Sequence, residues 1–218
     1  MDYTQQVEAV SRAVAKDVVT LTNGKPARAI ILRETFPAPV QTVWDAVTQP
    51  ESLATWFAPV SGDLRMNGHY SIMGNARGTV TECRPPEGFA LSWELGEVIS
   101  AVRVNLRAAD DDAVTELELR HTFPVDAHWR EYGPGAGGVG WDMTLIGLTL
   151  FLAGRPKPSE EDWAASREAA EFAERASERW RDAAIEGGED EAWARKAGDK
   201  TTAFYVPGWK AYASSDGK

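Results

Sequence analysis

Apolar and polar residues alternate through the middle of the chain, which is the pattern of β-strands that bury one face. The alternation is clearest at Phe89, Leu91, Trp93 and Leu95. The pattern predicts six strands, over residues 63–66, 69–73, 78–84, 89–95, 98–107 and 114–123. Because short linkers of polar, glycine or proline residues separate most of these segments, we expect an antiparallel meander.

Two further strands and a short helix are predicted near the N-terminus. Residues 18–22 and 28–36 flank Asn23-Gly24, and an Asn-Gly pair between β-rich runs is a strong hairpin signal. We therefore expect these strands to be antiparallel neighbours. Before them, three valines at helical spacing predict a short helix within residues 4–16 that docks on the domain.

Helical periodicity appears on both sides of the meander. Residues 39–48 predict a short amphipathic helix, and a second short helix follows that carries Trp56 and Phe57. A long helix is predicted over residues 138–152, in which Asp142 near the start complements the helix dipole. The apolar strand faces need a cover, so the expected fold class is α+β, a curved antiparallel sheet wrapped around this long helix.

A curved sheet that wraps one helix often leaves an apolar gap, and small ligands bind in such gaps. Eight residues are predicted to line a ligand-binding cavity here: Trp56, Phe57, Met73, Trp93, His121, Phe123, Trp141 and Leu145. Trp56 and Phe57 are the best candidates for contacting a ligand, because their helix lies beside the expected opening. Large side chains such as Trp93 could instead fill the gap, so the sequence leaves open whether the cavity is hollow.

His121 shares its strand parity with Leu117 and Phe123, which places a polar ring on an apolar face. A buried polar group without a hydrogen bond costs about 1–3 kcal/mol, so the ring needs a partner. Two interpretations follow. We favour a hydrogen-bonded core histidine over a pocket residue that binds a ligand carbonyl or serves as an acid or base near neutral pH.

The last third of the chain predicts a helix that begins after an N-cap at Ser159 and ends at Gly187-Gly188. Residues 159–200 carry 13 acids and 7 bases, so a solvated outer face is expected. An alanine-rich stripe is expected to pack on its own domain or on a second copy. Residues 201–205 predict a short strand or turn, and residues 213–218 a loose end.

Composition narrows the classes of partner. The net charge of −10 and the pI of about 4.9 argue against nucleic acid and membrane surfaces, because both attract positive proteins. Cys83 is the single cysteine, so it forms no internal disulfide, and we interpret it as a packing thiol. We find neither a secretory signal nor an apolar run of about 18 residues, which favours the cytoplasm. The three histidines lack metal-site spacing, and we expect no metal and no cofactor.

Residues 133–138 formally match the dinucleotide-binding pattern Gly-x-Gly-x-x-Gly. That site requires a strand before the turn and a parallel strand after the helix, whereas another helix follows here, so we reject it. The segment is expected to be a glycine-rich connection at the pocket mouth that could act as a gate. No Gly-x-Ser-x-Gly nucleophile motif is present, and we assign the acidic residues 110–112 to a turn.

Several motifs together are similar to those of the START-like (SRPBCC, helix-grip) superfamily. They are Arg33 and Phe36 on one strand, Pro39 to Thr48, Leu53 to Trp56, and Gly140-Trp141 in the long helix. The chain resembles the branch named after the activator of the ATPase of the ninety-kilodalton heat-shock chaperone. The resemblance covers residues 18–153 and implies the helix-grip fold. We accordingly divide the chain into an N-terminal helix (1–17), a START-like domain (18–155) and a helical extension that packs on it (156–218).

The resemblance allows three classes of function, because members of the superfamily bind unrelated hydrophobic ligands, catalyse several reactions or assist chaperones. We favour a protein that binds a small hydrophobic or amphipathic molecule. The second class is an enzyme of the cyclase, dehydratase or hydrolase kind, with His121 or a nearby acid as general acid or base. The third is a protein-interaction module whose partner is a chaperone. A homodimer, formed with a second copy of the chain, is a separate candidate partnership suggested by the alanine-rich stripe.

Overall fold

The computed structural model describes residues 3–109 and 112–207. In these residues nine strands form one antiparallel sheet in the order β1-β3-β9-β8-β7-β6-β5-β4, and β2 also pairs with β3. The strands are β1 (Ser11–Val14), β2 (Val19–Thr20), β3 (Pro26–Phe36), β4 (Val60–Gly62), β5 (His69–Ile72), β6 (Arg77–Arg84), β7 (Gly88–Leu95), β8 (Val98–Ala109) and β9 (Val114–Pro124). The predicted antiparallel meander is confirmed for β5 to β9.

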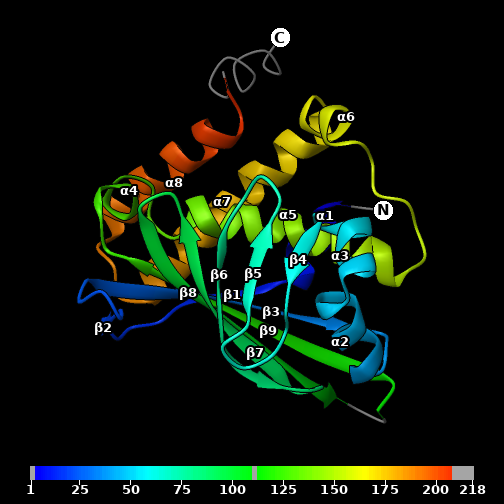
Figure 1. Ribbon diagram of the computed structural model, residues 1–218. Coiled ribbons are helices and arrows are strands. Elements are labelled where there is room, and N and C mark those ends of the chain that lie inside the picture. The colour runs from blue at the N-terminus through cyan, green and yellow to red at the C-terminus, as the bar shows by residue number, and fades with distance from the viewer. Residues whose placement is uncertain (1–2, 110–111, 208–218) are drawn as a thin grey trace.

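Eight helices accompany this sheet in the described residues. They are α1 (Tyr3–Ala9), α2 (Val40–Thr48), α3 (Pro50–Trp56), α4 (Ala127–Tyr132), α5 (Gly135–Leu152), α6 (Glu160–Ala164), α7 (Arg167–Glu186) and α8 (Glu191–Tyr205). Figure 1 shows the sheet curved around α5, with α2 and α3 closing one end and α7 and α8 lying beyond α5. The fold is therefore the α+β arrangement that the alternating pattern predicts.

Strand register confirms which face of the sheet is apolar. The pairs Val102↔His121, Val104↔Leu119 and Leu106↔Leu117 join β8 to β9, and all six residues are buried. The same parity fails at the end of β7, where Leu95 is 52% exposed. The helices that cover the sheet do not extend over the β7–β8 hairpin. Alternation in this segment therefore reflects the strand conformation and does not show that its side chains are buried.

The hairpin predicted at Asn23-Gly24 is present. Val19 pairs with Ala27 and Thr20 with Pro26, and Gly24 adopts a positive φ of 81° in the turn. Before this hairpin, the prediction of one helix over residues 4–16 is only half right. The helix ends at Ala9, and β1 pairs with the free edge of β3, where it buries Val14 from a strand. Pairing to an available edge here overrides the helical spacing of the valines.

The strand predicted over residues 63–66 is wrong, because the edge strand β4 lies at Val60–Gly62 instead. Residues 63–68 form a tight loop in which Gly68 N–H donates to the Arg65 carbonyl (2.7 Å) and Asn67 has a positive φ of 65°. The Asp-Leu-Arg-Met alternation belongs to this loop, where the chain reverses before β5.

The C-terminal helix predicted from Ser159 is interrupted. Ser159 does cap α6, but Ser166 caps a second helix, α7, by accepting the N–H of Ala169. The alanine-rich stripe of α7 is buried together with Phe172 and Trp180. Residues 201–205 form the last turn of α8 and not a strand, because α8 continues along α4 and α5. The predicted loose end at 213–218 lies outside the described residues.

The glycine-rich connection predicted at 133–138 is mostly helix, because α5 begins at Gly135. These glycines allow neighbouring helices to approach closely: a Cβ at Gly138 would overlap the indole ring of Trp180, and one at Gly135 would lie 2.9 Å from Cγ2 of Thr201. Both glycines are buried. The segment is therefore a helix-packing surface, and the proposed gating loop is not present.

The central helix α5 has the length and composition of a membrane span, with a mean hydropathy of 1.3 over its 18 residues. In this fold 56% of that helix is buried inside the protein, between the sheet and α7. The helix is therefore apolar because nearly every side of it packs against other parts of the protein.

Candidate functional site

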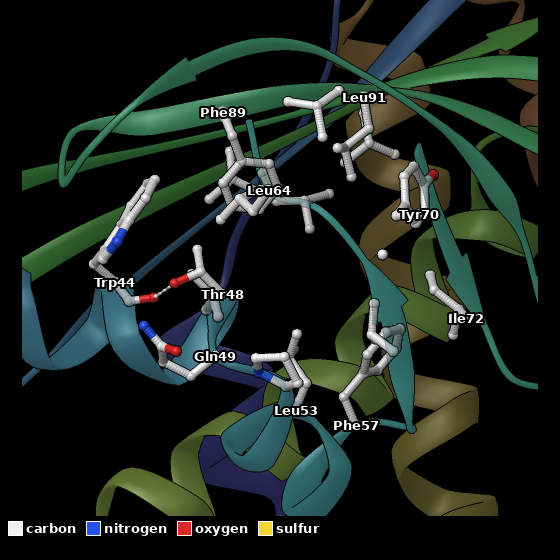
Figure 2. A pocket seen from close by; sticks show the side chains of 18 of the residues that line it. Trp44, Thr48, Gln49, Leu53, Phe57, Leu64, Tyr70, Ile72, Phe89 and Leu91 are labelled. Atoms are coloured by element: carbon white, nitrogen blue, oxygen red, sulfur yellow. Dashed lines mark hydrogen bonds between the residues drawn. The ribbon is translucent and has the colours of Figure 1, made fainter. Parts of the chain in front are cut away.

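A cavity of about 440 Å³ lies between the sheet and α5, so the gap that the sequence predicts is hollow. Its walls come from α2, α3, α5 and strands β4 to β9. Figure 2 shows Leu53 and Phe57 on one side of the space, facing Phe89 and Leu91 across it, with Tyr70 and Ile72 at one end. A volume in this range is typical of sites for small molecules.

The helices α2 and α3 form a wedge that closes one side of the cavity. Pro50 starts α3 at a position where a missing N–H is harmless, and the Trp56 indole N–H donates to the Ala46 carbonyl (2.9 Å), which ties α3 to α2. Gly147 of α5 allows the close approach, because a Cβ there would lie 2.7 Å from the Trp56 carbonyl oxygen. A hydrogen bond therefore joins α3 to α2, and close packing places α3 against α5.

Aliphatic side chains make up most of the apolar lining, and aromatic rings complete it. Three pairs have ring centroids 5.5–6.1 Å apart, and all six residues line the cavity: Trp93–Trp141, Trp56–Phe57 and Trp44–Phe89. Two of the pairs are edge-to-face, the arrangement that the ring quadrupole favours. These contacts fix the rings against one another, so the cavity walls have a definite shape.

Three of the polar lining residues are not exposed, and each donates its hydroxyl proton to a backbone carbonyl. Thr48 donates to Trp44 (2.7 Å), Tyr70 to Ser92 (2.8 Å) and Thr144 to Gly140 (2.9 Å). Burial and the nearby carboxylate of Glu94 raise the pKa of Tyr70, so its hydroxyl stays protonated. The interior is therefore apolar and uncharged.

The mouth of the cavity lies between the α2–α3 junction and the chain after β4. Gln49, Ser61, Asp63 and Leu64 line the cavity and are exposed. Asp63 accepts a hydrogen bond from the guanidinium of Arg65, two residues later. The polar end of the site is thus at the solvent boundary, and the apolar part lies behind it.

Five of the eight residues predicted from the sequence line this cavity: Trp56, Phe57, Trp93, Trp141 and Leu145. The other three do not. Met73 is 69% exposed at the end of β5, because the strand ends at Ile72 and the chain turns outward. His121 and Phe123 lie further along β9, where their rings stack on each other with centroids 3.7 Å apart.

His121 is fully satisfied by hydrogen bonds inside the core. Its Nδ1 accepts the indole N–H of Trp141 (2.9 Å), so its proton resides on Nε2, which lies 2.8 Å from Ser100 Oγ. Ser100 in turn donates to the Trp93 carbonyl (3.1 Å). Burial lowers the pKa of His121 to about 3 and keeps the ring neutral. This network holds two aromatic lining residues, Trp93 and Trp141, in place from the side that lies away from the cavity.

The sequence prediction missed several lining residues, notably Trp44, Tyr70, Phe89 and Thr144. Trp44 shares the apolar face of its helix, and Phe89 shares the parity of Trp93, so periodicity marks both as inward-facing. Thr144 lies one turn from Trp141 on α5, but a threonine in an apolar helix carries no signal of its own.

A second buried polar cluster lies on another side of α5. Asp142 is fully buried, forms an ion pair with Arg12 (3.0 Å) and accepts the indole N–H of Trp180 (2.8 Å). It sits two turns inside α5, so the predicted role of complementing the helix dipole is wrong. Because it pairs with β1 and α7 instead of lining the cavity, we assign Asp142 to the structure of the fold.

Glu34 of β3 is buried close to this cluster. Its Oε1 accepts hydrogen bonds from Gln6 (2.7 Å) and Thr149 (3.1 Å), whereas Oε2 has no hydrogen-bond partner among the described residues. Burial raises the pKa of Glu34 to about 7, with a further contribution from the nearby carboxylate of Asp142. No group of three metal-ligating side chains occurs in the described residues.

Comparison with known proteins places this arrangement in a family. The sequence model described as Activator of Hsp90 ATPase homolog 1-like protein matches residues 37–153, which include α2, α3, the meander and α5. The crystal structure of CalU16 from Micromonospora echinospora is 33% identical, with a TM-score of 0.67, and the match covers 80% of this chain and 98% of CalU16. This protein belongs to the activator of Hsp90 ATPase homolog 1-like family.

Two further solved structures have a similar fold. The solution structure of CalU16 is 32% identical over 82% of this chain and 97% of CalU16, with a TM-score of 0.69. The Hsp90 activator PFC0360w from Plasmodium falciparum is 21% identical over 60% of this chain and 99% of its own, with a TM-score of 0.50. No functionally curated protein matches the sequence. The predicted START-like, helix-grip fold of this family is therefore confirmed.

Proposed function

We propose that this family member binds a small hydrophobic or amphipathic molecule in the cavity between the sheet and α5. The observation that carries the proposal is a hollow of about 440 Å³ with an apolar lining of aliphatic and aromatic residues and polar groups gathered at its mouth. Burying a ligand's apolar surface there would contribute roughly 25 cal/mol per Å².

In this proposal the wedge and α5 supply the main contacts. The residues that contact the ligand are Trp56 of α3, Phe57 directly after it, Trp93 of β7, and Trp141 and Leu145 of α5. Polar groups of the ligand lie near Gln49 at the mouth, where water remains accessible. Because fixed aromatic pairs form the walls, the ligand meets a preorganised site and little side-chain entropy is lost on binding.

The enzyme hypothesis with His121 as acid or base receives no support from the geometry. Both ring nitrogens of His121 are engaged in hydrogen bonds within the core, and the ring does not line the cavity. The titratable residues that do line it are Asp63, paired at the mouth, and Tyr70, which stays protonated. A convergent set of acid and base groups, which such catalysis requires, is not found in the lining.

A chaperone partner remains a prediction from the family resemblance, and a cytoplasmic location remains a prediction from the sequence. The exposed apolar side chains of the described residues lie on separate segments, including Val18 on the β2 hairpin, Leu95 on the β7–β8 turn and Phe204 on α8. The cavity, with its defined apolar lining, is the stronger basis for a function.

A screen by native mass spectrometry would test the proposal. The purified protein is incubated with planar aromatic compounds, fatty acids and polyketide-like compounds, and tryptophan emission is recorded in parallel. We expect a bound mass together with a change in emission, because four tryptophans line the cavity. Absence of binding across all these classes would overturn the proposal.

A matched pair of variants locates the bound molecule. Leu91 lines the cavity on β7, whereas Leu95, four residues later on the same strand, is 52% exposed and outside it. We expect Leu91→Trp to fill the space and weaken binding at least about tenfold, whereas Leu95→Trp binds as the wild type does. Equal binding by both variants would place the ligand elsewhere.

A further inference from the structure

The charge of the lining residues restricts the class of ligand more than the shape of the cavity does. None of the lining residues is a lysine, arginine or histidine, and Asp63 is the one formally charged side chain among them. A carboxylate that is removed from water without a cation or several hydrogen-bond donors is strongly disfavoured. The apolar walls alone would accept a ring system or a fatty chain equally well, so charge decides between them.

Two arginines that adjoin exposed lining residues are already paired. Arg65 donates to Asp63 at the mouth, and Arg84, next to the lining residue Pro85, pairs with Glu82 (2.6 Å) and Glu87 (3.2 Å). A ligand carboxylate would have to compete with these protein carboxylates for each guanidinium. The net charge of −10 adds a long-range repulsion of anions.

We infer that the cavity selects uncharged ligands and rejects carboxylates and other anions of the same shape. This inference rests on the proposed function and names the class of ligand for the same site. Neutral polar groups such as hydroxyls and carbonyls remain compatible with it, because Gln49 and Ser61 at the mouth can form hydrogen bonds with them. Free fatty acids, whose chains would fit the apolar walls, are therefore expected to bind more weakly than the corresponding alcohols.

Shape-matched pyrene compounds test the selection. Binding of 1-pyrenemethanol, pyrene and 1-pyrenecarboxylate is compared at pH 7.5 through quenching of tryptophan emission and native mass spectrometry. The carboxylate is fully ionised at this pH. We expect the alcohol and pyrene to bind at least about tenfold more tightly than the carboxylate.

A substitution at the mouth should weaken the selection. Asp63→Asn releases the guanidinium of Arg65 beside the opening, so we expect affinity for 1-pyrenecarboxylate to rise at least about fivefold while pyrene binds as before. Asp182→Asn is the matched control, because it removes the same charge from an arginine pair on α7, away from the cavity. It should leave the affinities of all three compounds unchanged.

The outcomes separate the two proposals. Binding of the carboxylate as tight as that of the alcohol, or an equal gain in Asp63→Asn and Asp182→Asn, would overturn the selection of uncharged ligands but leave the cavity as a binding site. No binding by any of the three compounds, together with a negative screen, would overturn both.

Discussion

The indole N–H of Trp180 donates to Oδ2 of Asp142 at 2.8 Å, inside a contact where both side chains are fully buried. This bond joins α7, outside the family match, to α5, the helix that the sheet surrounds. Arg12 of β1 completes the cluster by pairing with the same carboxylate (3.0 Å). The N-terminal strand, the central helix and the C-terminal extension therefore share one buried charge.

Trp180→Phe should destabilise the protein because it removes a hydrogen bond to a buried carboxylate. We expect a loss of about 2–3 kcal/mol in the free energy of unfolding, measured by urea denaturation. Trp193→Phe is the control, since it removes a similar indole bond to the Arg130 carbonyl (2.9 Å) in a solvent-accessible position, and should cost less than about 1 kcal/mol. Equal losses in the two variants would contradict a special role for the Asp142 bond.

Gly138→Ala should be strongly destabilising, since its Cβ would overlap the buried indole of Trp180. We expect a loss of at least about 2 kcal/mol, whereas Gly140→Ala in the same helix should be neutral or stabilising by up to about 1 kcal/mol. At Gly140 the Cβ would meet one atom, Oη of Tyr205 at 3.2 Å. Adding Trp180→Leu to Gly138→Ala should recover part of the loss in a double-mutant cycle, and strict additivity would argue against the clash.

Glu34 should make stability depend on pH in the direction opposite to that of a salt-bridged acid. Its pKa is raised by burial from 4.5 to about 7, so between these values the folded protein binds more protons than the unfolded chain. Stability should therefore be highest below pH 4.5, as far as this group is concerned, and fall by up to about 3 kcal/mol as pH rises to about 7.

The Glu34→Gln variant isolates that contribution. The amide keeps the shape and the contact with Thr149 but has no titration, so the difference in unfolding free energy between wild type and variant should change between pH 4.5 and 7 and be constant above. Urea titrations at several pH values measure it. A difference that does not vary with pH would show that Glu34 titrates normally.

His121→Phe should lower stability without abolishing ligand binding. The substitution keeps a ring against Phe123 but removes the acceptor for the Trp141 indole and the contact with Ser100, which we expect to cost about 1–3 kcal/mol. The pKa of His121 is lowered to about 3, so the ring does not titrate between pH 6 and 8. Ligand affinity of the wild type should therefore show no change over this range that depends on His121. A binding transition near pH 6.5 that disappears in His121→Phe would restore the acid–base interpretation.

Periodicity in the sequence was sufficient for the strands β5 to β9 and for the helices α2, α3 and α5, because apolar residues recur in each at the spacing of its secondary structure. Motifs such as Leu53 to Trp56 and Gly140-Trp141 also placed the chain in its family. For the site, five of eight predicted residues line the cavity. Trp93, Trp141 and Leu145 lie inside their elements, where side-chain direction follows from spacing, whereas Trp56 is the last residue of α3 and Phe57 is its C-cap.

The failures share a different cause. Met73 lies one residue beyond the end of β5, and His121 and Phe123 lie past the part of β9 that faces the cavity, so parity was right for His121 while position along the strand was not. Likewise Val10 and Val14 are both buried as predicted, but edge pairing with β3 places Val14 in a strand. A local pattern shows which side of a strand or helix faces the core. It does not show how far along that element the packing against the core extends.

The sequence by itself determined the fold class, the alternating faces of the sheet and the apolar character of the central helix, since all of these depend on near neighbours in the chain. Only the tertiary structure decided that the cavity is hollow, that residues 135–138 are a helix-packing surface and that Asp142 pairs with Arg12 and Trp180. These features depend on contacts between segments more than 30 residues apart, where shape and charge must match in space and spacing along the chain carries no record of the partner.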